Sequence, residues 1–274
     1  MYRWSSCPGS VREAAKAPPS VSSKYASEGT DAHAFGAMLL TLKHNPGKYI
    51  NDTINYDGRR VTVDKEMASA IQIYVDHVWL NRPDHIVVQI ETKFDLSAVH
   101  PGLFGTADAV IWDDKAKLLE VVDLKYGAGI AVEVTDNPQL HYYALGALLA
   151  SGYKARTVRM TIVQPRCDHG GGPVRSQDID AIDLLDFKTD LKKYAVATED
   201  PKAPLAPGYW CRFCPASGIC PELKRQAQKA AKIDFQPANV EERKAAGQLP
   251  YDPVLLKQAL DSREVVKAWL KAVD

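Results

Sequence analysis

Three charged residues near the middle of the chain have the types and spacing needed to hold a metal ion and act on a phosphate ester. Asp108 lies in one expected strand, and Asp123 and Lys125 lie in the next, after a turn at 113–115. Because side chains alternate along a strand, Asp123 and Lys125 share a face. Mg²⁺ prefers one or two carboxylates with waters and a phosphate, and an adjacent ammonium could orient or help deprotonate a water. The pattern favours metal-dependent hydrolysis.

The register of this hairpin decides whether the two carboxylates meet. If the loop is symmetric about the Lys115–Ala116 bond, Asp108 lies opposite Asp123, with Cβ atoms roughly 5 Å apart. Two carboxylates that close repel each other unless a cation lies between them. A one-residue slip would break the pairing, and an exposed hairpin with solvated charges is the alternative. The near-continuous apolar run 118–124 indicates burial on both faces, so a buried Asp there needs a partner.

The composition is that of an ordinary soluble globular protein. The chain has 274 residues, 46% apolar and 25% charged, with a formal net charge of zero. No apolar stretch is long enough to span a membrane, and no signal segment opens the chain, so we expect a cytoplasmic protein with no membrane partner. Local lysine and arginine clusters at 188–193 and 224–232 could follow a nucleic-acid strand or could be solvated helix faces.

The elements expected around these residues alternate between helices and strands. Helices are expected at about 28–43, 64–80, 137–150 and 183–198, and strands at 86–94, 107–112, 118–124 and 157–164. Thr30 or Asp31 is the expected N-cap of the first helix. This order predicts an α/β fold in which a central mixed sheet is flanked by helices. We expect one domain at 1–232 and a linker with a partial helical segment at 233–274, truncated inside its helix.

Three further polar residues have the spacing to join the carboxylates. His33 follows Gly29 in a G-x-x-x-H pattern, and a neutral imidazole is a competent ligand for Mn²⁺ or Mg²⁺ beside carboxylates. A single histidine is more often structural, so His33 alone would carry little weight. Gln139 and Tyr143 lie one helical turn apart and share a face, which could look into the site or form a helix edge.

The order of these motifs resembles the RecB-like branch of the PD-(D/E)xK nuclease superfamily. Its G-x-x-x-H helix, G-x-x-D strand, D-x-K strand and Q-x-x-x-Y helix correspond to segments beginning at Gly29, Gly105, Asp123 and Gln139. The resemblance implies a restriction-endonuclease-like core. It also implies that Mg²⁺ or Mn²⁺ is held by His33, Asp108, Asp123, the Leu124 carbonyl and an acidic residue matched by Glu91. Lys125 would act on the attacking water, with Gln139 and Tyr143 supporting substrate and site.

The cysteines extend the resemblance. Five cysteines in a cytoplasmic chain argue against a disulfide framework and for a metal site or isolated thiols. Related AddB-type helicase-nucleases and CRISPR-adaptation exonucleases carry one cysteine before the core and a C-x₂-C-x₅-C after it, which together bind a [4Fe–4S] cluster. The resemblance implies the same role for Cys7, Cys211, Cys214 and Cys220, with N- and C-terminal segments joined by the cluster. Zinc is the competing metal, and Cys167 stands apart.

The function implied by the resemblance is that of a metal-dependent DNA exonuclease. Within residues 1–222 the chain looks most similar to phage- and prophage-encoded members, which implies a role in phage recombination or DNA processing. The expected partners are DNA, as single strands or duplex ends, and a phage recombination or single-strand-binding protein. The alternatives are a catalytically idle DNA-binding or recombination-partner module that keeps the fold, and a redox-sensing cluster protein, which would not need the D-x-K hairpin.

Overall fold

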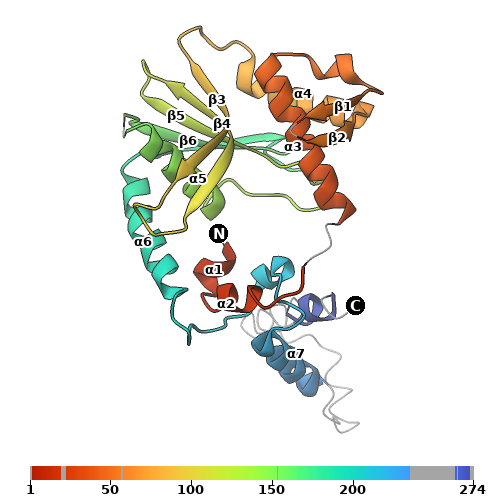
Figure 1. Cartoon of the computed structure of the whole chain (residues 1–274), viewed down its shortest axis with the longest axis vertical. Helices are drawn as coiled ribbons and strands as arrows, with labels where there is room; N and C mark the ends of the chain where they lie inside the picture. Colours follow the sequence, from red (N-terminus) through yellow and green to blue (C-terminus); the bar gives the residue numbers. More distant parts are fainter. Residues whose placement is uncertain are drawn as a thin grey trace. The chain divides into compact units, whose positions relative to one another are not determined.

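The chain forms two compact units, of which the larger carries the carboxylates. The computed structural model describes residues 2–19, 23–56, 58–152, 154–234, 263 and 265–271. The larger unit is Val21–Lys192, and the smaller consists of Met1–Ser20 together with Lys193–Asp274 (Figure 1). Within the described residues, no helix has the length and apolar character needed to cross a membrane.

The larger unit is a five-stranded sheet with helices and a small hairpin packed around it. Its elements are α3 (Lys24–Leu42), η1 (Pro46–Tyr49), β1 (Thr53–Tyr56), β2 (Arg59–Thr62), α4 (Lys65–Trp79), β3 (Val87–Asp95), β4 (Phe104–Asp113), β5 (Leu118–Leu124), α5 (Pro138–Ala150), β6 (Thr157–Val163) and β7 (Val174–Asp180). The helix α6 (Asp183–Ala197) follows. This is the α/β fold with flanking helices that the sequence predicts.

The sheet is mixed, and its middle strand carries the D-x-K motif. The strand order is β3-β4-β5-β6-β7; β5 and β6 are parallel, and the other neighbours are antiparallel. Every residue of β5 after Leu118 is buried, so the prediction of a strand buried on both faces is confirmed. A chain that puts an aspartate into such a strand must give its carboxylate a partner.

Two groups of helices cover the sheet. Residues of α3 and α4, among them Phe35 and Ile71, pack in one core with Val122 and Leu124 of β5. The helix α5 packs across β4, β5 and β6 (Figure 1). The N-cap side chains of α4 and α5, Asp64 and Asn137, accept hydrogen bonds from backbone N–H groups in the first turn of each helix.

The first helix begins earlier than the sequence indicates. Ser23, rather than Thr30 or Asp31, is its N-cap, and its hydroxyl accepts from the N–H of Ala26. Because the Glu-Gly-Thr segment lies inside this helix, Thr30 donates its hydroxyl to the carbonyl of Ala26 instead of capping. His33 therefore lies in the middle of a regular helix, and its direction is fixed by helical turns on both sides.

Strand β7 and the β1–β2 hairpin were not predicted from the sequence. The strand β7 is an edge strand whose residues alternate between exposed and less exposed positions, and its sequence, Val174–Asp180, is rich in charge. Aspartate is depleted in strands, so pairing with β6 outweighs local preference here. The short β1–β2 hairpin contributes Val61 to the core shared by α3 and α4.

The smaller unit brings the start of the chain against the segment after α6. Its elements are α1 (Tyr2–Ser6), α2 (Ser10–Ala14), η2 (Tyr209–Phe213) and α7 (Pro221–Asp234), and residues 265–271 are helical. The N–H of Gly9 donates to the carbonyl of Pro204 at 3.0 Å. A Cβ on Gly9 would lie 2.5 Å from the carbonyl oxygen of Ala203, so the close approach of the two backbones requires glycine.

Candidate functional site

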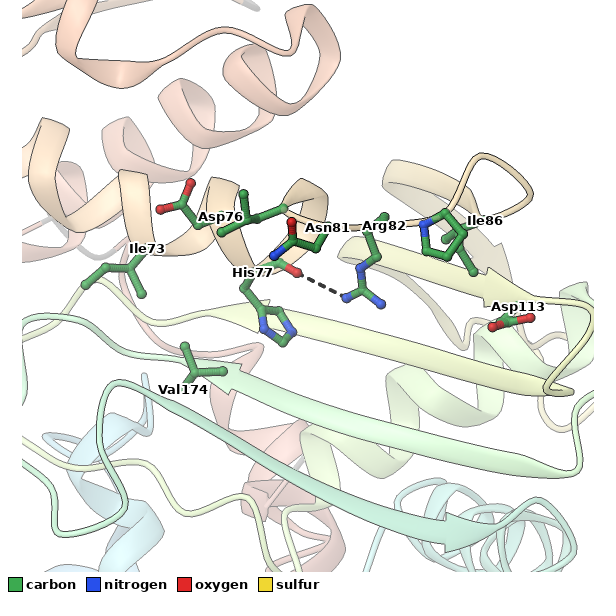
Figure 2. A pocket seen from close by; sticks show the side chains of 10 residues that line it. Ile73, Asp76, His77, Asn81, Arg82, Ile86, Asp113 and Val174 are labelled. Carbon is green, nitrogen blue, oxygen red and sulfur yellow. Dashed lines mark hydrogen bonds between the residues drawn. The ribbon is translucent and has the colours of Figure 1, made fainter.

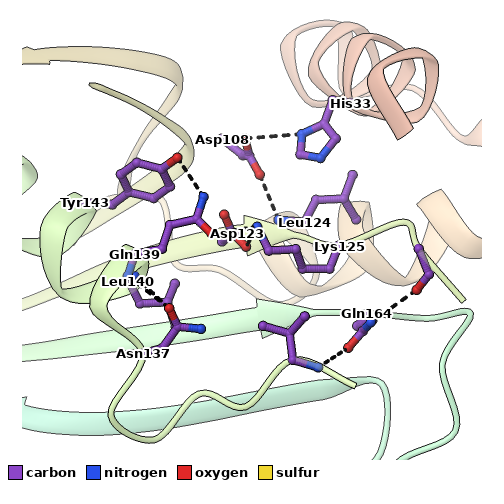
Figure 3. Close-up of polar contacts among 12 residues, drawn as sticks. His33, Asp108, Asp123, Leu124, Lys125, Asn137, Gln139, Leu140, Tyr143 and Gln164 are labelled. Carbon is purple, nitrogen blue, oxygen red and sulfur yellow. Dashed lines mark hydrogen bonds and ion pairs between the residues drawn. The ribbon is translucent and has the colours of Figure 1, made fainter. Parts of the chain in front are cut away.

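The β4–β5 hairpin has the register predicted from its symmetric loop. Ala109 pairs with Val122 and Asp113 pairs with Leu118. Asp108 and Asp123 are the next residues beyond the first of these pairs, one on each strand. Oδ2 of Asp108 accepts the backbone N–H of Leu124 at 2.7 Å, which ties the carboxylate of β4 to the end of β5 (Figure 3).

His33 reaches the same point from α3. Its Nδ1 lies 3.3 Å from Oδ1 of Asp108, so the two oxygens of Asp108 face different partners (Figure 3). Burial by itself lowers the pKa of His33, but the charge and hydrogen bond of Asp108, together with the charge of Asp123, outweigh burial and raise this pKa above its usual value. The histidine of the G-x-x-x-H pattern therefore does contact Asp108 in the folded chain.

Asp123 and Lys125 form a nearly buried ion pair. Nζ of Lys125 lies 2.7 Å from Oδ2 of Asp123, a residue that is 3% exposed. Burial raises the pKa of Asp123 to about 6, and the charge of Asp108 adds to this shift. Burial alone would lower the pKa of Lys125, but the charge of Asp123 raises it above its usual value. Each charge is therefore held in place by the other.

The start of α5 connects to Lys125. Nζ of Lys125 donates to Oε1 of Gln139 at 3.2 Å, and Nε2 of Gln139 donates to the hydroxyl of Tyr143 at 2.8 Å (Figure 3). Asn137 accepts from the N–H of Gln139 at 3.0 Å and so fixes the first turn of the helix. The shared face of Gln139 and Tyr143 looks into the site and does not form a solvated helix edge.

Two more residues lie close to the carboxylates. Glu91 of β3 falls between the pairs Ile90–Ala109 and Thr92–Ala107, which places it beside Asp108, and its φ of 48° interrupts the strand. The hydroxyl of Tyr74 is buried; burial, followed by the charges of Asp108, Glu91 and Asp123, raises the pKa of Tyr74 well above its usual value. In the sequence Tyr74 reads as one apolar position of a helix, and only the fold brings it near the carboxylates.

The donor chemistry of this cluster fits a divalent cation. Within the described residues, no group of three or more His, Cys, Asp or Glu side chains is already arranged around a metal position. Oδ2 of Asp123 is nonetheless buried without a hydrogen bond, because its contact with Lys125 lacks hydrogen-bond geometry. Carboxylate oxygens and an imidazole form the donor set that Mg²⁺ and Mn²⁺ accept. His33, Asp108 and Asp123 are the residues that would hold the ion, with Glu91 and the Leu124 backbone beside them.

A buried amide anchors the loop that follows Lys125. Gln164, at the end of β6, accepts the N–H of Val132 at 2.9 Å and donates to the carbonyls of Gly127 and Ile130 (Figure 3). Arg175 also donates to Oε1 of Gln164, at 2.9 Å. These bonds hold the chain between Lys125 and α5 to the sheet, which restricts the position of Gln139.

The four cysteines of the C-x₂-C-x₅-C frame and the N-terminus come together in the smaller unit. Cys7, Cys211, Cys214 and Cys220 line one small cavity, with Leu205, Trp210, Ala216 and Leu223 among its apolar walls. The N–H of Ala206 donates to Sγ of Cys7 at 3.2 Å, and the N–H of Gly208 donates to Sγ of Cys211 at 3.4 Å. Four thiols in one cavity with N–H donors to sulfur are the ligand types that a [4Fe–4S] cluster uses, although these described cysteines are not already arranged around a common metal position. Cys167 belongs to the other unit.

A second polar network lies under a surface pocket of the larger unit. The pocket has a volume of about 610 Å³ and is lined by the end of α4 and the turn after it, including His77 and Arg82 (Figure 2). Behind it, the buried Glu120 of β5 contacts Nε2 of His77 at 2.7 Å and Nη2 of Arg82 at 2.9 Å. The signal for this network was available in the sequence, since Glu120 interrupts the apolar run of β5 and so requires partners.

Comparisons with known proteins give a family and distantly similar solved structures. The model of the family described as "Protein of unknown function (DUF2800)" matches residues 1–274. A solved structure titled "Crystal structure of SSO0001" is 16% identical, with a TM-score of 0.29, and the match covers 49% of this chain. The matched region spans 60% of the length of that structure.

Proposed function

The chain belongs to the DUF2800 family, and we propose that it is a metal-dependent DNA exonuclease of the RecB-like PD-(D/E)xK type. Its substrate would be DNA ends or single strands, in phage recombination or DNA processing. The observation that carries the proposal is the convergence of Asp108, Asp123 and Lys125 where the end of β5 lies beside the middle of β4, with His33 against Asp108. Buried like charges are costly unless a cation or ammonium balances them.

The metal would be held by His33, Asp108 and Asp123. When bound there, a divalent ion would supply Lewis acidity at a phosphoryl oxygen and neutralise charge that develops on it. Asp108 is fixed for this role by the Leu124 N–H on one oxygen and by His33 beside the other. Asp123 is fixed by its place in the most buried strand of the sheet.

Lys125 would orient the attacking water and balance the negative charge that develops on it, because its raised pKa keeps Nζ protonated. Its position is set by Asp123 on one side and Gln139 on the other, and Gln139 is in turn held by Tyr143. A water-activating group must lie within hydrogen-bond reach of the proton that it handles. The chain Tyr143–Gln139–Lys125 would therefore serve to keep the ammonium in position.

The cysteine cavity would hold a [4Fe–4S] cluster with a structural role. Its ligands come from both ends of the smaller unit, which is already held together by backbone contacts such as Gly9 with Pro204. A cluster that bridges residues about two hundred positions apart would restrict the unfolded chain strongly. Hydrolysis itself would not involve this site.

The test is a cleavage assay on end-labelled single-stranded and blunt duplex DNA with Mn²⁺ or Mg²⁺. We expect the parent protein to shorten the labelled DNA and Asp123→Ala to be inactive, with a circular dichroism spectrum like that of the parent showing that the variant is folded. Matched controls are Asp114→Ala and Asp178→Ala, which remove exposed carboxylates of the β4–β5 turn and of β7. DNA binding without cleavage by the parent would favour the idle binding module, and full activity of Asp123→Ala would end the nuclease assignment.

A further inference from the structure

Ser10 is a buried polar side chain in the wall of the cysteine cavity. The residue is 3% exposed, and its hydroxyl oxygen is buried without a hydrogen-bond partner. The same cavity is lined by Cys7, Cys211, Cys214 and Cys220. A hydroxyl left unpaired in such a place loses its hydrogen bonds to water without replacing them, which destabilises the folded state. Either this hydroxyl stays unsatisfied in the folded protein, or it donates a hydrogen bond to an acceptor bound in the cavity.

The backbone of Ser10 is fixed by hydrogen bonds with Cys7 and Arg3. The N–H of Ser10 donates to the carbonyl of Cys7 at 2.9 Å, and Nη1 of Arg3 donates to the carbonyl of Ser10 at 2.8 Å. Both backbone polar groups of Ser10 are therefore satisfied. Only its side-chain hydroxyl is available for a ligand in the cavity, and it lies three residues from Cys7, at the first position of α2.

The neighbouring sulfurs already accept hydrogen bonds from the backbone. Ala206 donates to Cys7 and Gly208 donates to Cys211, so the cavity provides N–H groups that favour anionic sulfur. A hydroxyl is a further donor of the same kind, and a thiolate or sulfide is the acceptor that this cavity would offer once a cluster is bound. The charge of Glu13, also in the wall, is balanced by Arg12 and Lys16.

We propose that Ser10 donates a hydrogen bond to a sulfur of the [4Fe–4S] cluster and thereby raises the reduction potential of that cluster. The inference rests on the cluster put forward under the proposed function. Hydrogen bonds to cluster sulfurs stabilise the more negative, reduced state and are among the determinants of its potential. Ser10 is thus a positioning and tuning residue, not a ligand. Its removal should leave the iron in place and make one-electron reduction harder.

The experiment compares parent holoprotein, purified without oxygen, with Ser10→Ala in a dithionite titration followed by electron paramagnetic resonance. We expect unchanged iron content and a lower potential in Ser10→Ala. A tenfold fall in the ratio of reduced to oxidised cluster at a fixed potential corresponds to about 59 mV for one electron. The pair Ser10→Thr and Ser10→Val has matched volume and differs in the hydroxyl alone, so it separates hydrogen bonding from packing even if Ser10→Ala loses iron.

A higher potential in Ser10→Thr than in Ser10→Val supports the proposal, as does a lower potential in Ser10→Ala than in the parent. Equal potentials in the parent and Ser10→Ala, or in the Thr and Val variants, would overturn it while the cluster assignment stands. Colourless parent protein without iron would instead overturn the cluster itself, and the inference would fall with it. The iron content of the parent protein therefore shows whether the cluster assignment fails, and the potentials of the variants show whether the Ser10 proposal fails.

Discussion

Lys125 Nζ lies 2.7 Å from Oδ2 of Asp123 at the end of the central strand, where the Asp123 side chain is buried and the Lys125 side chain is 24% exposed. Asp123 lies in β5 and Lys125 directly follows the last residue of that strand, so the D-x-K spacing itself creates the pair. Because burial is unfavourable for both charges, removing either side chain leaves the other charge without its partner and destabilises the folded protein. Their roles can still be separated, because one is a carboxylate able to bind metal and the other is an ammonium.

The first prediction separates metal binding from water activation. Lys125→Ala should lower the cleavage rate by about 10²–10⁴-fold, because it removes the ammonium that orients the attacking water and balances the charge developing on it. The same variant should still bind Mn²⁺, whereas Asp123→Ala should lose both activity and binding. Calorimetric Mn²⁺ titration and a cleavage assay on each protein decide this. Lys117→Ala, which removes an exposed lysine paired with Asp114, is the control and should behave like the parent.

The second prediction concerns the choice of metal. An imidazole is a softer ligand than a carboxylate oxygen, so a site that includes His33 should support greater activity with Mn²⁺ than with Mg²⁺. His33→Ala should narrow the ratio of the two rates, which steady-state assays with each metal will measure. Equal rates with both metals in the parent protein would argue that His33 contacts Asp108 without binding the ion.

The convergence of site residues was predictable because it depends on local periodicity. A symmetric loop gives the β4–β5 register, and strand alternation then places Asp108 near Asp123. Helical periodicity likewise places Gln139 and Tyr143 on one face. The roles of these residues stay predictions. The proximity of Asp123 to Lys125 follows from a spacing of two residues, and that of Gln139 to Tyr143 from a spacing of four.

Other contacts could not be derived, since they join elements far apart in the sequence. Tyr74 reads as one apolar position of an amphipathic helix, and only the packing of α4 brings its hydroxyl near the carboxylates. The edge strand β7 pairs with β6 despite its aspartates. The start of α3 was missed because Ser23 competes with Thr30 as a cap, and both have suitable side chains.

The third prediction distinguishes the cluster cysteines from the remaining one. Cys211→Ser should lower iron content and the melting temperature, because metal binding at such a site is coupled to folding. The parent protein, prepared without oxygen, should contain about four irons per chain. Cys167→Ser should keep the iron content of the parent, as Cys167 lies outside the cysteine cavity. If the protein is colourless and contains one zinc per chain, the cysteines form a structural zinc site and not an iron–sulfur cluster. The nuclease proposal would be unaffected by that result.

The last prediction concerns pH and the buried Glu120. Burial by itself raises the pKa of Glu120, but His77, Arg82 and Thr161 outweigh burial and lower it from 4.5 to about 2. A carboxyl whose pKa is lower in the folded state contributes stability above its unfolded pKa and loses it as pH falls through the folded pKa. The contribution should be fully present above pH 4.5, at roughly 3 kcal/mol, and should fade between pH 4.5 and 2.

Urea unfolding of the parent and Glu120→Gln across this pH range will measure that contribution. We expect the difference in unfolding free energy to shrink steadily as pH falls from 4.5 towards 2. The control is Asp178→Asn, which breaks the exposed pair with Arg159 and should change stability by about 1 kcal/mol or less at any pH. A difference for Glu120→Gln that stays constant through this range would show that the network acts through packing, since only a titrating carboxylate makes the contribution depend on pH.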